Sequence, residues 1–380
     1  MAYVNYSIYT TWQEVFVEAV RDLLRQIPAE QTPLRLVFFG SPHNNVEYIA
    51  QRGMILGILE QWFGYYRMPL LSYVAQPPLG ATLSLEVQSV DNELYSLASY
   101  KTFEGYRYLV IQPLGKKMIL TEGILPTNID ASIMVQSQQV LSIIGQILNT
   151  EGMSINSIHR QWNYIELITK QTSGKQNYQE FNDARSAFYS ASDWASGYPA
   201  ATGIGTNCGG IMVEIDAAQL SVNDLVVALD NELQVAAHAY STDVLLGEKS
   251  CKTTPKFERA KAVVYGSTFG HKEAKIYISG TAAIRGEESL TDVGIERQTK
   301  ITLENIEFLI SIQNLKRAGV ELPRGGRIEL FRVYLKHAEH YDVVHAIIAK
   351  AYPTVPALYV VTDVCRDELL IEIEGTAVAN

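Results

Sequence analysis

The stretch RQWNYIELI, residues 160–168, recurs in altered form as LFRVYLKHA at residues 330–338. PAATGIG and then IMVEIDA follow the first stretch, and PALYVVT and then LLIEIEG follow the second. In this alignment Tyr164 falls on Tyr334, and Glu214 falls on Glu372. A repeated order of this kind marks a duplicated unit. We therefore predict two similar α/β modules in the chain.

The elements expected around the two copies follow nearly the same order. Around the first we expect strands at 106–113 and 117–120, a helix at 132–149, a strand at 158–168, a helix at 177–190 and a strand at 211–217. Around the second we expect a strand at 275–283, a helix at 298–316, a strand at 327–336, a helix at 338–351 and strands at 357–364 and 368–374.

The N-terminal hundred residues also alternate helix and strand. We expect helices at 11–26 and 45–63, and strands at 34–40, 71–75 and 82–87. The predicted organisation is an N-terminal α/β region over 1–100, a central module over 101–255 and a C-terminal module over 256–380.

The composition places the chain among globular proteins. It has 380 residues, of which 47% are hydrophobic and 19% charged, which is enough apolar material for a large core in two or three domains. Disordered and fibrous classes are excluded. A formal charge of −10 argues against a nucleic-acid partner, because such proteins need a basic face.

Cysteine usage and the chain start indicate the compartment. Cys208, Cys251 and Cys365 are odd in number and contain no C-x-x-C pair, so we expect neither a disulfide framework nor a zinc knuckle. No signal-peptide pattern opens the sequence, and no apolar run approaches membrane-spanning length. We expect a soluble, unprocessed, cytoplasmic protein without a membrane partner.

The last module resembles the YjgF-like reactive-intermediate deaminase family. The resemblance rests on a YISGTA strand, a helix opening with Gln298, a VYLK strand and a closing IEIEG strand. It implies a sheet with two helices on one face, and ligand clefts between neighbouring units. The deaminases of that family hold a substrate carboxylate with an arginine before the closing glutamates. Ala357 stands there, and Ala200 and Ala201 stand in the first copy, which disfavours deaminase activity.

A longer arrangement resembles the chorismatase family, in which an N-terminal region is joined to YjgF-like modules. The matching stretches are VAQPPLG (74–80), RQWNYI (160–165), YQEFNDARSAFY (178–189), PAATGIGT (199–206), KFERA (256–260), SGTAAIRGEE (279–288) and VCRDELLIEIEG (364–375). The resemblance implies an α/β (α+β) fold with duplicated YjgF-like, chorismate-mutase-like sheets. It also implies removal of pyruvate from chorismate to give 3-hydroxybenzoate or a related ring acid for secondary metabolism.

Glu372 is the candidate for the acid that this chemistry needs. Cleavage of the enolpyruvyl ether begins with protonation of its methylene carbon. In LLIEIEG, strand alternation puts Glu372 and Glu374 on one face. A glutamate inside a cleft would have a raised pKa and could act as a general acid. The pattern alone also fits a half-exposed strand, and the resemblance favours the acid for Glu372 but not for Glu374 or Glu214.

Positive side chains are expected to hold the two carboxylates of the substrate. Arg160 and Arg185 are the candidates, since each lies in a matched stretch, although either could be a surface charge. Lys336 could bind a carboxylate or could merely end a strand. Tyr164 could bind a ligand oxygen or could belong to the core.

Small residues and one cysteine complete the predicted site. In the family, the strand carrying Gly280, Thr281 and Ala282 lines the ring pocket, and close helix packing is the alternative explanation for its small residues. Cys365 is the second candidate catalytic residue, because it resembles the cysteine of the hydroxybenzoate-forming branch of chorismatases; a small buried hydrophobe in place of a reactive thiol is the alternative.

We predict no metal and no organic cofactor. His337 and His340 lack H-E-x-x-H spacing, and the Gly-rich stretch 202–210 lacks the features of a phosphate loop. We expect that stretch to form a bulged strand and a turn.

Two other functions remain open. The stretch AYSTDVLLGEKSCKTTP (239–255) lacks the tyrosine- and proline-rich run of the family, which favours a non-catalytic small-aromatic-acid binder or assembly subunit as the alternative. An imine or enamine deaminase is a weaker alternative. The chain could be a monomer with an internal pseudo-trimer or a homotrimer, and neither the ring product nor its pathway follows from the sequence.

Overall fold

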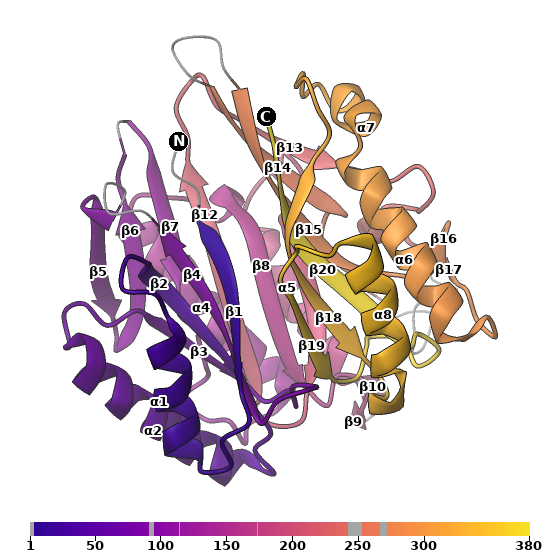
Figure 1. The fold of residues 1–380 in the computed structure, drawn as a ribbon. Coiled ribbons are helices and arrows are strands. Elements are labelled where there is room, and N and C mark those ends of the chain that lie inside the picture. The colour runs from indigo at the N-terminus through magenta and orange to yellow at the C-terminus, as the bar shows by residue number, and fades with distance from the viewer. Residues whose placement is uncertain (1–3, 91–94, 114, 173, 242–252, 267–271) are drawn as a thin grey trace.

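The computed structural model describes residues 4–90, 95–113, 115–172, 174–241, 253–266 and 272–380. Three large β-sheets meet in the interior of the molecule, and the helices lie outside them (Figure 1). The predicted mixed α/β class is confirmed.

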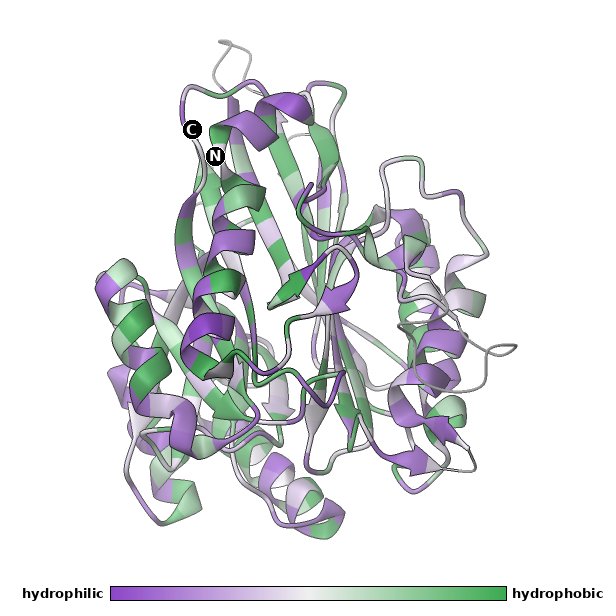
Figure 2. Ribbon diagram, turned by 90° about the vertical axis from the view of Figure 1, so that its right-hand side faces the viewer, coloured by the Kyte–Doolittle hydropathy of each residue, from purple (hydrophilic) through white to green (hydrophobic). Residues whose placement is uncertain are grey.

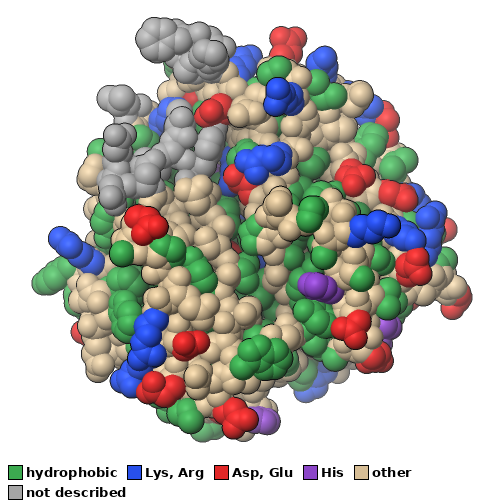
Figure 3. Space-filling view, viewed as in Figure 1, with side chains coloured by type: hydrophobic (Ala, Val, Ile, Leu, Met, Phe, Trp, Pro, Cys, Tyr) green, Lys and Arg blue, Asp and Glu red, His purple; other side chains and the backbone are tan. Residues whose placement is uncertain are grey.

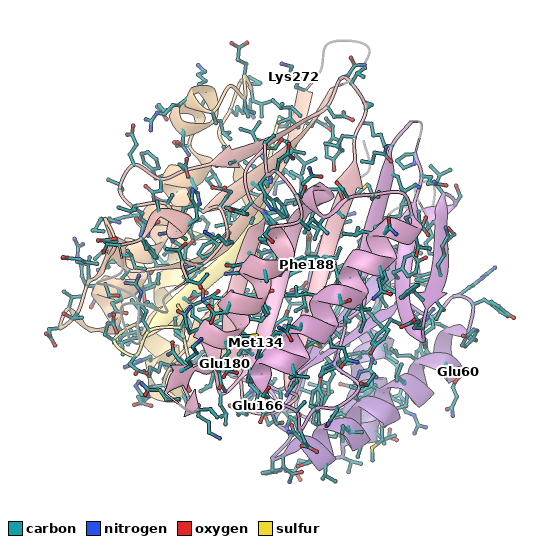
Figure 4. All side chains as sticks on the ribbon, turned by 180° about the vertical axis from the view of Figure 1, so that it is seen from behind. Glu60, Met134, Glu166, Glu180, Phe188 and Lys272 are labelled. Carbon is teal, nitrogen blue, oxygen red and sulfur yellow. The ribbon has the colours of Figure 1, made fainter. Side chains whose placement is uncertain are left out.

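The central sheet has the strand order β11-β8-β12-β7-β6-β5. Its elements are β5 (Ala98–Phe103), β6 (Tyr106–Ile111), β7 (Lys117–Thr121), α4 (Ile133–Thr150), β8 (Ile158–Glu166), α5 (Asn177–Tyr189), β11 (Ala200–Thr206) and β12 (Ile211–Gln219). A short hairpin of β9 (Gln171–Thr172) and β10 (Lys175–Gln176) precedes α5. Helices α4 and α5 cover the outer face of this sheet, with Phe188 of α5 packed beside Gly145 of α4 (Figure 4).

The third sheet repeats this order as β19-β18-β20-β15-β14-β13. Its elements are β13 (Leu225–Leu229), β14 (Ala260–Gly266), β15 (Lys272–Ala282), α6 (Gly294–Ile310), α7 (Ile312–Arg317), β18 (Arg327–Leu335), α8 (Tyr341–Ala351), β19 (Ala357–Val361) and β20 (Ile371–Ala379). A small hairpin of β16 (Ile284–Arg285) and β17 (Glu288–Ser289) extends from β15. In each of these two sheets one edge pair is parallel, β11 with β8 and β19 with β18, and the other pairs are antiparallel.

The N-terminal region is a third, shorter copy. Its sheet has the order β3-β2-β4-β1, with β3 parallel to β2, and in the part of the chain that the structure describes it has no counterpart of the two strands that complete the other sheets. Its elements are β1 (Asn5–Thr11), α1 (Phe16–Gln26), β2 (Thr32–Phe39), α2 (Asn45–Phe63), β3 (Leu70–Val74) and β4 (Leu83–Val90). The chain therefore contains three related sheets.

Strand register corrects the alignment of the two glutamates. Tyr164 lies opposite Met212, whereas Tyr334 lies opposite Glu372. Glu214 is therefore equivalent to Glu374, two residues beyond the position that the sequence alignment suggested. Side chains alternate with a period of two, so a slip of two residues preserves the hydrophobic pattern and is invisible in it.

Several elements differ from their predicted bounds. The predicted helix at 11–26 begins only at Phe16, because β1 extends to Thr11. Strands β5, β13 and β14 were not predicted. The predicted helix at 298–316 is divided at Ser311, which has an extended backbone and caps α7 because its side-chain hydroxyl accepts a hydrogen bond from the Asn314 amide. The Gly-rich stretch does form a strand and a turn, with positive φ at Gly209 and Gly210.

Hydrophobic packing holds each sheet to its helices. The largest core cluster joins α6 and α8 to the third sheet through residues such as Ile306, Ile348 and Phe331. Hydrophobic and polar residues alternate along the helices, as the green and purple bands of Figure 2 show, and α6 and α8 bury residues such as Ile306 and Ile348 against the third sheet. This arrangement leaves the opposite faces of the three sheets to meet one another.

Candidate active site

A pocket of about 750 Å³, including its open mouth, lies between the central and third sheets. Five of the seven stretches that carry the family resemblance line it. Its lining residues are Gln176, Tyr178, Gln179, Asn182, Ala201, Gly203, Tyr240, Pro255, Phe257, Arg259, Gly280, Ala282, Ile284, Cys365, Arg366, Leu369 and Glu372. Phe257, Ile284 and Leu369 supply apolar wall, and the amides and arginines supply polar groups.

Glu372 is the carboxyl group of this pocket. It is 5% exposed, and its carboxyl makes no hydrogen bond to any residue that the structure describes. Burial, and secondly the charge of Glu374, raise the pKa of Glu372 to about 8, against the lowering effect of Arg259 and Arg160. A raised pKa favours the protonated form of the Glu372 carboxyl near pH 7, which is the form that a general acid needs.

Gly280 provides the surface against which this carboxyl lies. A Cβ atom at residue 280 would overlap with Oε1 of Glu372. Glu372 pairs with Ala282 across β15 and β20, and the register shifts between Ile278 and Thr281. This bulge turns Gly280 toward the pocket, so that its missing side chain leaves room for the acid.

Two arginines line the pocket together with the acid. Arg259 is 3% exposed, and its Nη2 donates to the carbonyl of Val235 at 2.8 Å and to the hydroxyl of Tyr240. Arg366 donates from Nη1 to the carbonyl of Glu287 and to the Ser289 hydroxyl, each at 3.0 Å. Neither guanidinium has a carboxylate partner among the described residues, so both can bind an anion.

Arg185 is a third cation beside the pocket. It is 1% exposed, lies over the ring of Phe181, and donates from Nη2 to Asn182, which lines the pocket, at 2.6 Å. Its Nε has no hydrogen-bond partner, and no carboxylate of the described residues pairs with it. A buried guanidinium without a counterion is costly. An anion bound at Asn182 would offset the free-energy cost of burying the charge of Arg185.

A cyclic set of buried ion pairs joins the three sheets beneath the pocket. Each sheet supplies an arginine to a glutamate of the next one, and these glutamates occupy equivalent register positions opposite Val37, Trp162 and Arg332. The pairs are Arg35 with Glu214 (3.9 Å), Arg160 with Glu374, and Arg332 with Glu86 (2.6 Å). Trp162 lies against all three guanidiniums, with its ring centroid 4.5 to 5.6 Å from their central carbons. We call these seven residues the inter-sheet ring.

The structure places several predicted ligand-binding residues outside the pocket lining. Arg160 is committed to Glu374 and to Thr202 in the ring. Tyr164 is buried and accepts a hydrogen bond from Arg332 at 2.7 Å. Lys336 donates to the carbonyl of Asp367 at 2.6 Å.

The small residues and the cysteine divide in the same way. Gly280 and Ala282 line the pocket, whereas Thr281 points away and donates to the carbonyl of Ser279 at 2.9 Å. Cys365 lines the pocket, and burial raises the pKa of its thiol to about 12. A raised pKa favours the protonated thiol over the thiolate, and the side chain forms part of the pocket wall.

Sequence reasoning did not single out Arg259 and Arg366. Both lie in matched stretches, KFERA and VCRDELLIEIEG, so a signal for them was present. Arg160 shares a face with Trp162 and Tyr164 by strand alternation. Only the packing between sheets decides that this face meets the ring and not the pocket.

A second site of the same construction is closed. Gly123 is equivalent to Gly280 by register, and Met212 stands where the third sheet has Glu372. A Cβ atom at residue 123 would overlap with the sulfur of Met212. Tyr48 and Tyr73 stack beside it with ring centroids 5.3 Å apart. This second position has the shape of the acid site without an acid.

Other sequence signals find no site. His337 and His340 stack edge to face, 5.4 Å apart, and no group of three or more potential metal ligands occurs among the residues that the structure describes. In the same residues, no helix is long and apolar enough to cross a membrane. On the face shown in Figure 3, acidic and basic side chains are interspersed.

The chain is similar to chorismatases in sequence. Residues 123–217 match the family model described as "Chorismatase FkbO/Hyg5-like, N-terminal". A 3-hydroxybenzoate synthase of Streptomyces hygroscopicus is 31% identical over 229 residues, which are 59% of this chain and 64% of that protein. A chorismatase of Streptomyces rapamycinicus is 33% identical over 228 residues, covering 58% and 63%. The matched region thus spans less than two thirds of either relative.

The fold is similar over nearly the whole chain. A crystal structure of a chorismatase superposes with a TM-score of 0.72 at 21% sequence identity, covering 99% of this chain and 98% of the other. The resemblance to chorismatases that the motifs predict is confirmed, and so is the predicted fold class.

Proposed function

We propose that this chain, a relative of chorismatases in sequence and fold, releases pyruvate from chorismate and leaves a hydroxybenzoate or a related ring acid. One observation carries the proposal. A carboxyl with a raised pKa, Glu372, shares a pocket with the guanidiniums of Arg259 and Arg366, with which no carboxylate of the described residues forms an ion pair. Acid cleavage of an enol ether that carries two carboxylates requires a proton donor for the ether and cations for the carboxylates.

The proposed reaction begins at the Glu372 carboxyl. Its proton passes to the methylene carbon of the enolpyruvyl group, and the electron pair of the double bond forms the new C–H bond. The resulting oxocarbenium ion is stabilised by the ionised Glu372 beside it. Water adds to the carbon that bears the ether oxygen and gives a hemiketal. The C–O bond to the ring then breaks, which releases pyruvate while the ring oxygen takes a proton. One water is consumed when the ring product is a dihydroxycyclohexadiene carboxylate. If the ring then becomes aromatic, one water leaves it, so that formation of a hydroxybenzoate consumes no net water.

We assign the carboxylates of the substrate to Arg259 and Arg366, with Arg185 acting through Asn182. Bidentate guanidinium binding fixes a planar carboxylate in position as well as neutralising it. Gly280, Ala282 and Cys365 form wall close to the acid, where small side chains leave space for the ring. Arg160 holds Glu374 in this assignment and does not touch the substrate.

The choice of ring acid stays within the proposal. A 3-hydroxybenzoate synthase is among the relatives, and Cys365 lies at the pocket wall, which favours 3-hydroxybenzoate. Secondary metabolism is the proposed destination of the product.

A non-catalytic binder of aromatic acids is the second candidate. It is favoured by the departure from the family pattern over 239–255, of which residues 242–252 lie outside the described residues. An imine deaminase is less favoured, because Ala357 and Ala200 occupy the expected arginine positions.

One incubation separates these candidates. The purified chain is mixed with chorismate, and pyruvate, ring products and chorismate binding are followed in parallel. Pyruvate with a stoichiometric ring acid supports the enzyme. Saturable binding without pyruvate supports the binder, and ammonia release from an enamine substrate supports the deaminase.

We also propose that the chain acts as a monomer. The inter-sheet ring is closed within one chain, so three sheets of a single molecule supply what a trimer of separate units would supply. Light scattering after gel filtration tests this, and a mass three times that of the chain would contradict it. For the three sheets we propose module limits near 5–90, 98–219 and 225–379, because β13 pairs with β14. The predicted limits were 1–100, 101–255 and 256–380.

A cytoplasmic location is part of the proposal. Cys208 and Cys365 are free thiols, which fits a reducing compartment.

A further inference from the structure

Glu374 lies two residues beyond Glu372 on β20, so the two carboxyls lie on the same face of the strand. Glu374 is 2% exposed and does not line the pocket. Burial alone would raise the pKa of Glu374. The guanidiniums of Arg160 and Arg332 have the opposite effect and lower this pKa below its usual range. Glu374 is therefore a fixed negative charge next to the acid.

Hydrogen bonds hold this charge from both sides. Oε1 accepts from Trp162 Nε1 at 3.0 Å, Tyr334 Oη at 2.9 Å and Arg332 Nη1 at 3.1 Å. Oε2 accepts from Arg160 and from the hydroxyl of Thr202. Five donors from three strands leave the carboxylate one position.

Thr202 links Glu374 to the surface on which the acid lies. Its hydroxyl donates to Glu374 and accepts from Arg160 Nη2 at 2.8 Å and from the Gly280 amide at 3.1 Å. All three hydrogen-bonding positions of the hydroxyl are thus used. Gly280 in turn lies against the Glu372 carboxyl. The inter-sheet ring therefore reaches the acid through a single hydroxyl group.

The charged and titratable groups around Glu372 come from five parts of the fold. They are Glu374 of β20, Arg160 of β8, Arg259 before β14, Tyr178 of α5 with Tyr240 near it, and Cys365 with Arg366 before β20. Glu374 is the only other carboxylate of this described set. Removing it leaves arginines as the nearest charges.

We propose that Glu374 is a positioning residue whose fixed negative charge keeps the neighbouring Glu372 in its neutral, proton-donating form. The inference rests on the proposed function, since it assigns a role to Glu374 in the same reaction. It gives one member of the inter-sheet ring, Glu374, a part in catalysis as well as in the fold.

The closed second site offers a matched control. Glu214 is equivalent to Glu374 in register and lies near Arg35, which is equivalent to Arg160. Met212 stands there in place of the acid. Glu214→Gln therefore makes the same substitution in the ring without a neighbouring acid to affect, although burial raises the pKa of Glu214 whereas the pKa of Glu374 is lowered.

The test compares the pH profile of kcat/KM for pyruvate release in the wild type, Glu374→Gln and Glu214→Gln. We expect the alkaline limb of the profile to move to lower pH by about one unit or more in Glu374→Gln, because the like charge is gone. We expect no shift of the limb in Glu214→Gln. An unshifted limb in a folded Glu374→Gln, or an equal shift in both variants, overturns the inference.

A second measurement tests the inference if Glu374→Gln does not fold or if the wild type does not release pyruvate. Glutamate labelled with ¹³C at Cδ is titrated in the wild type, with Glu372→Gln and Glu374→Asp identifying the two signals. We expect Glu374 ionised and Glu372 neutral at pH 7. A neutral Glu374 at pH 7 overturns the inference whether or not pyruvate is released. Absence of pyruvate with the expected titration overturns the proposed function alone.

Discussion

Gly280 and Glu372 lie in contact across neighbouring strands, and the Glu372 carboxyl occupies the space that any side chain at residue 280 would need. The φ angle of Gly280 is not positive, so this contact and not backbone freedom is the reason for a glycine there. The absence of a Cβ atom at residue 280 therefore determines both the shape of the pocket and the position of the Glu372 carboxyl.

Gly280→Ala should displace the acid. We expect a loss of kcat/KM of about 100-fold, since displacement of a reacting group by about 1 Å can cost that much. Gly123→Ala is the matched control, because its new methyl group meets the flexible side chain of Met212 at the closed site. It should lower the melting temperature without this loss of activity. Equal activity losses in the two variants would contradict the assignment.

Arg259→Met and Arg366→Met should weaken binding of the substrate. Each change removes a charged hydrogen-bonding group, and we expect KM for chorismate to rise about tenfold or more. Steady-state kinetics measure this, with melting temperatures recorded because Arg259 also bonds to Val235. Arg317→Met is the control, since Arg317 pairs with Glu232 on the exposed surface. A KM unchanged in both pocket variants would show that the anions bind elsewhere.

The activity of the wild type should fall at alkaline pH. Glu372 must be protonated to act, and burial raises its pKa to about 8. The rate of pyruvate release should therefore be constant around pH 6 to 7 and decrease tenfold per unit well above pH 8. A rate that rises through this range would identify a group acting as a base and would rule out Glu372 as the acid.

Glu372→Gln should stabilise the protein while abolishing its activity. The folded state holds a proton that the unfolded chain loses near pH 4.5, so the wild type loses stability as pH rises from there to about 8. Glutamine avoids that loss. We expect the variant to gain up to about 1.4 kcal/mol per pH unit across this window and nothing below it. Urea unfolding at pH 4.5 and 7.5 measures the difference, and equal gains at both values would contradict it.

Arg332→Met should destabilise the fold strongly. It leaves Glu86 buried and without its ion pair, and such breaks cost about 3–5 kcal/mol. Arg21→Met is the control, because the Arg21–Glu18 pair is exposed and should contribute under about 1 kcal/mol. Urea unfolding of both variants tests the prediction. A small loss for Arg332→Met would show that the ring does not hold the sheets together.

The sequence was sufficient to predict most of the repeated architecture. Strands such as β8 and β18 and helices such as α4 and α8 show clear apolar periodicity, which local physics sets. The N-terminal region was predicted as α/β but not as a third copy. Its relation to the others appears only in the sheet order and in the register of Glu86, because one glutamate is too little for a sequence match and the described residues of this region do not form the two outer strands.

The site was predictable only in part. Glu372 was predicted from its motif, and the structure places it in the pocket. The expected role of Arg160 depended on which sheet its face would meet, and that is decided by contacts such as the one with Glu374, 214 residues away. Local patterns carry no information on such contacts. That Arg259 and Arg366 have no carboxylate partner among the described residues depends on such contacts too.

The most direct test of the account is the rate of pyruvate release from chorismate by the wild type and Glu372→Gln, measured side by side at pH 7 with the ring product identified. We predict pyruvate and an equal amount of ring acid from the wild type, and a rate at least about 1,000-fold lower from the variant, since it has no proton to donate. Equal rates would contradict Glu372 as the acid. Absence of pyruvate from a folded wild type that binds chorismate would contradict the proposed reaction itself.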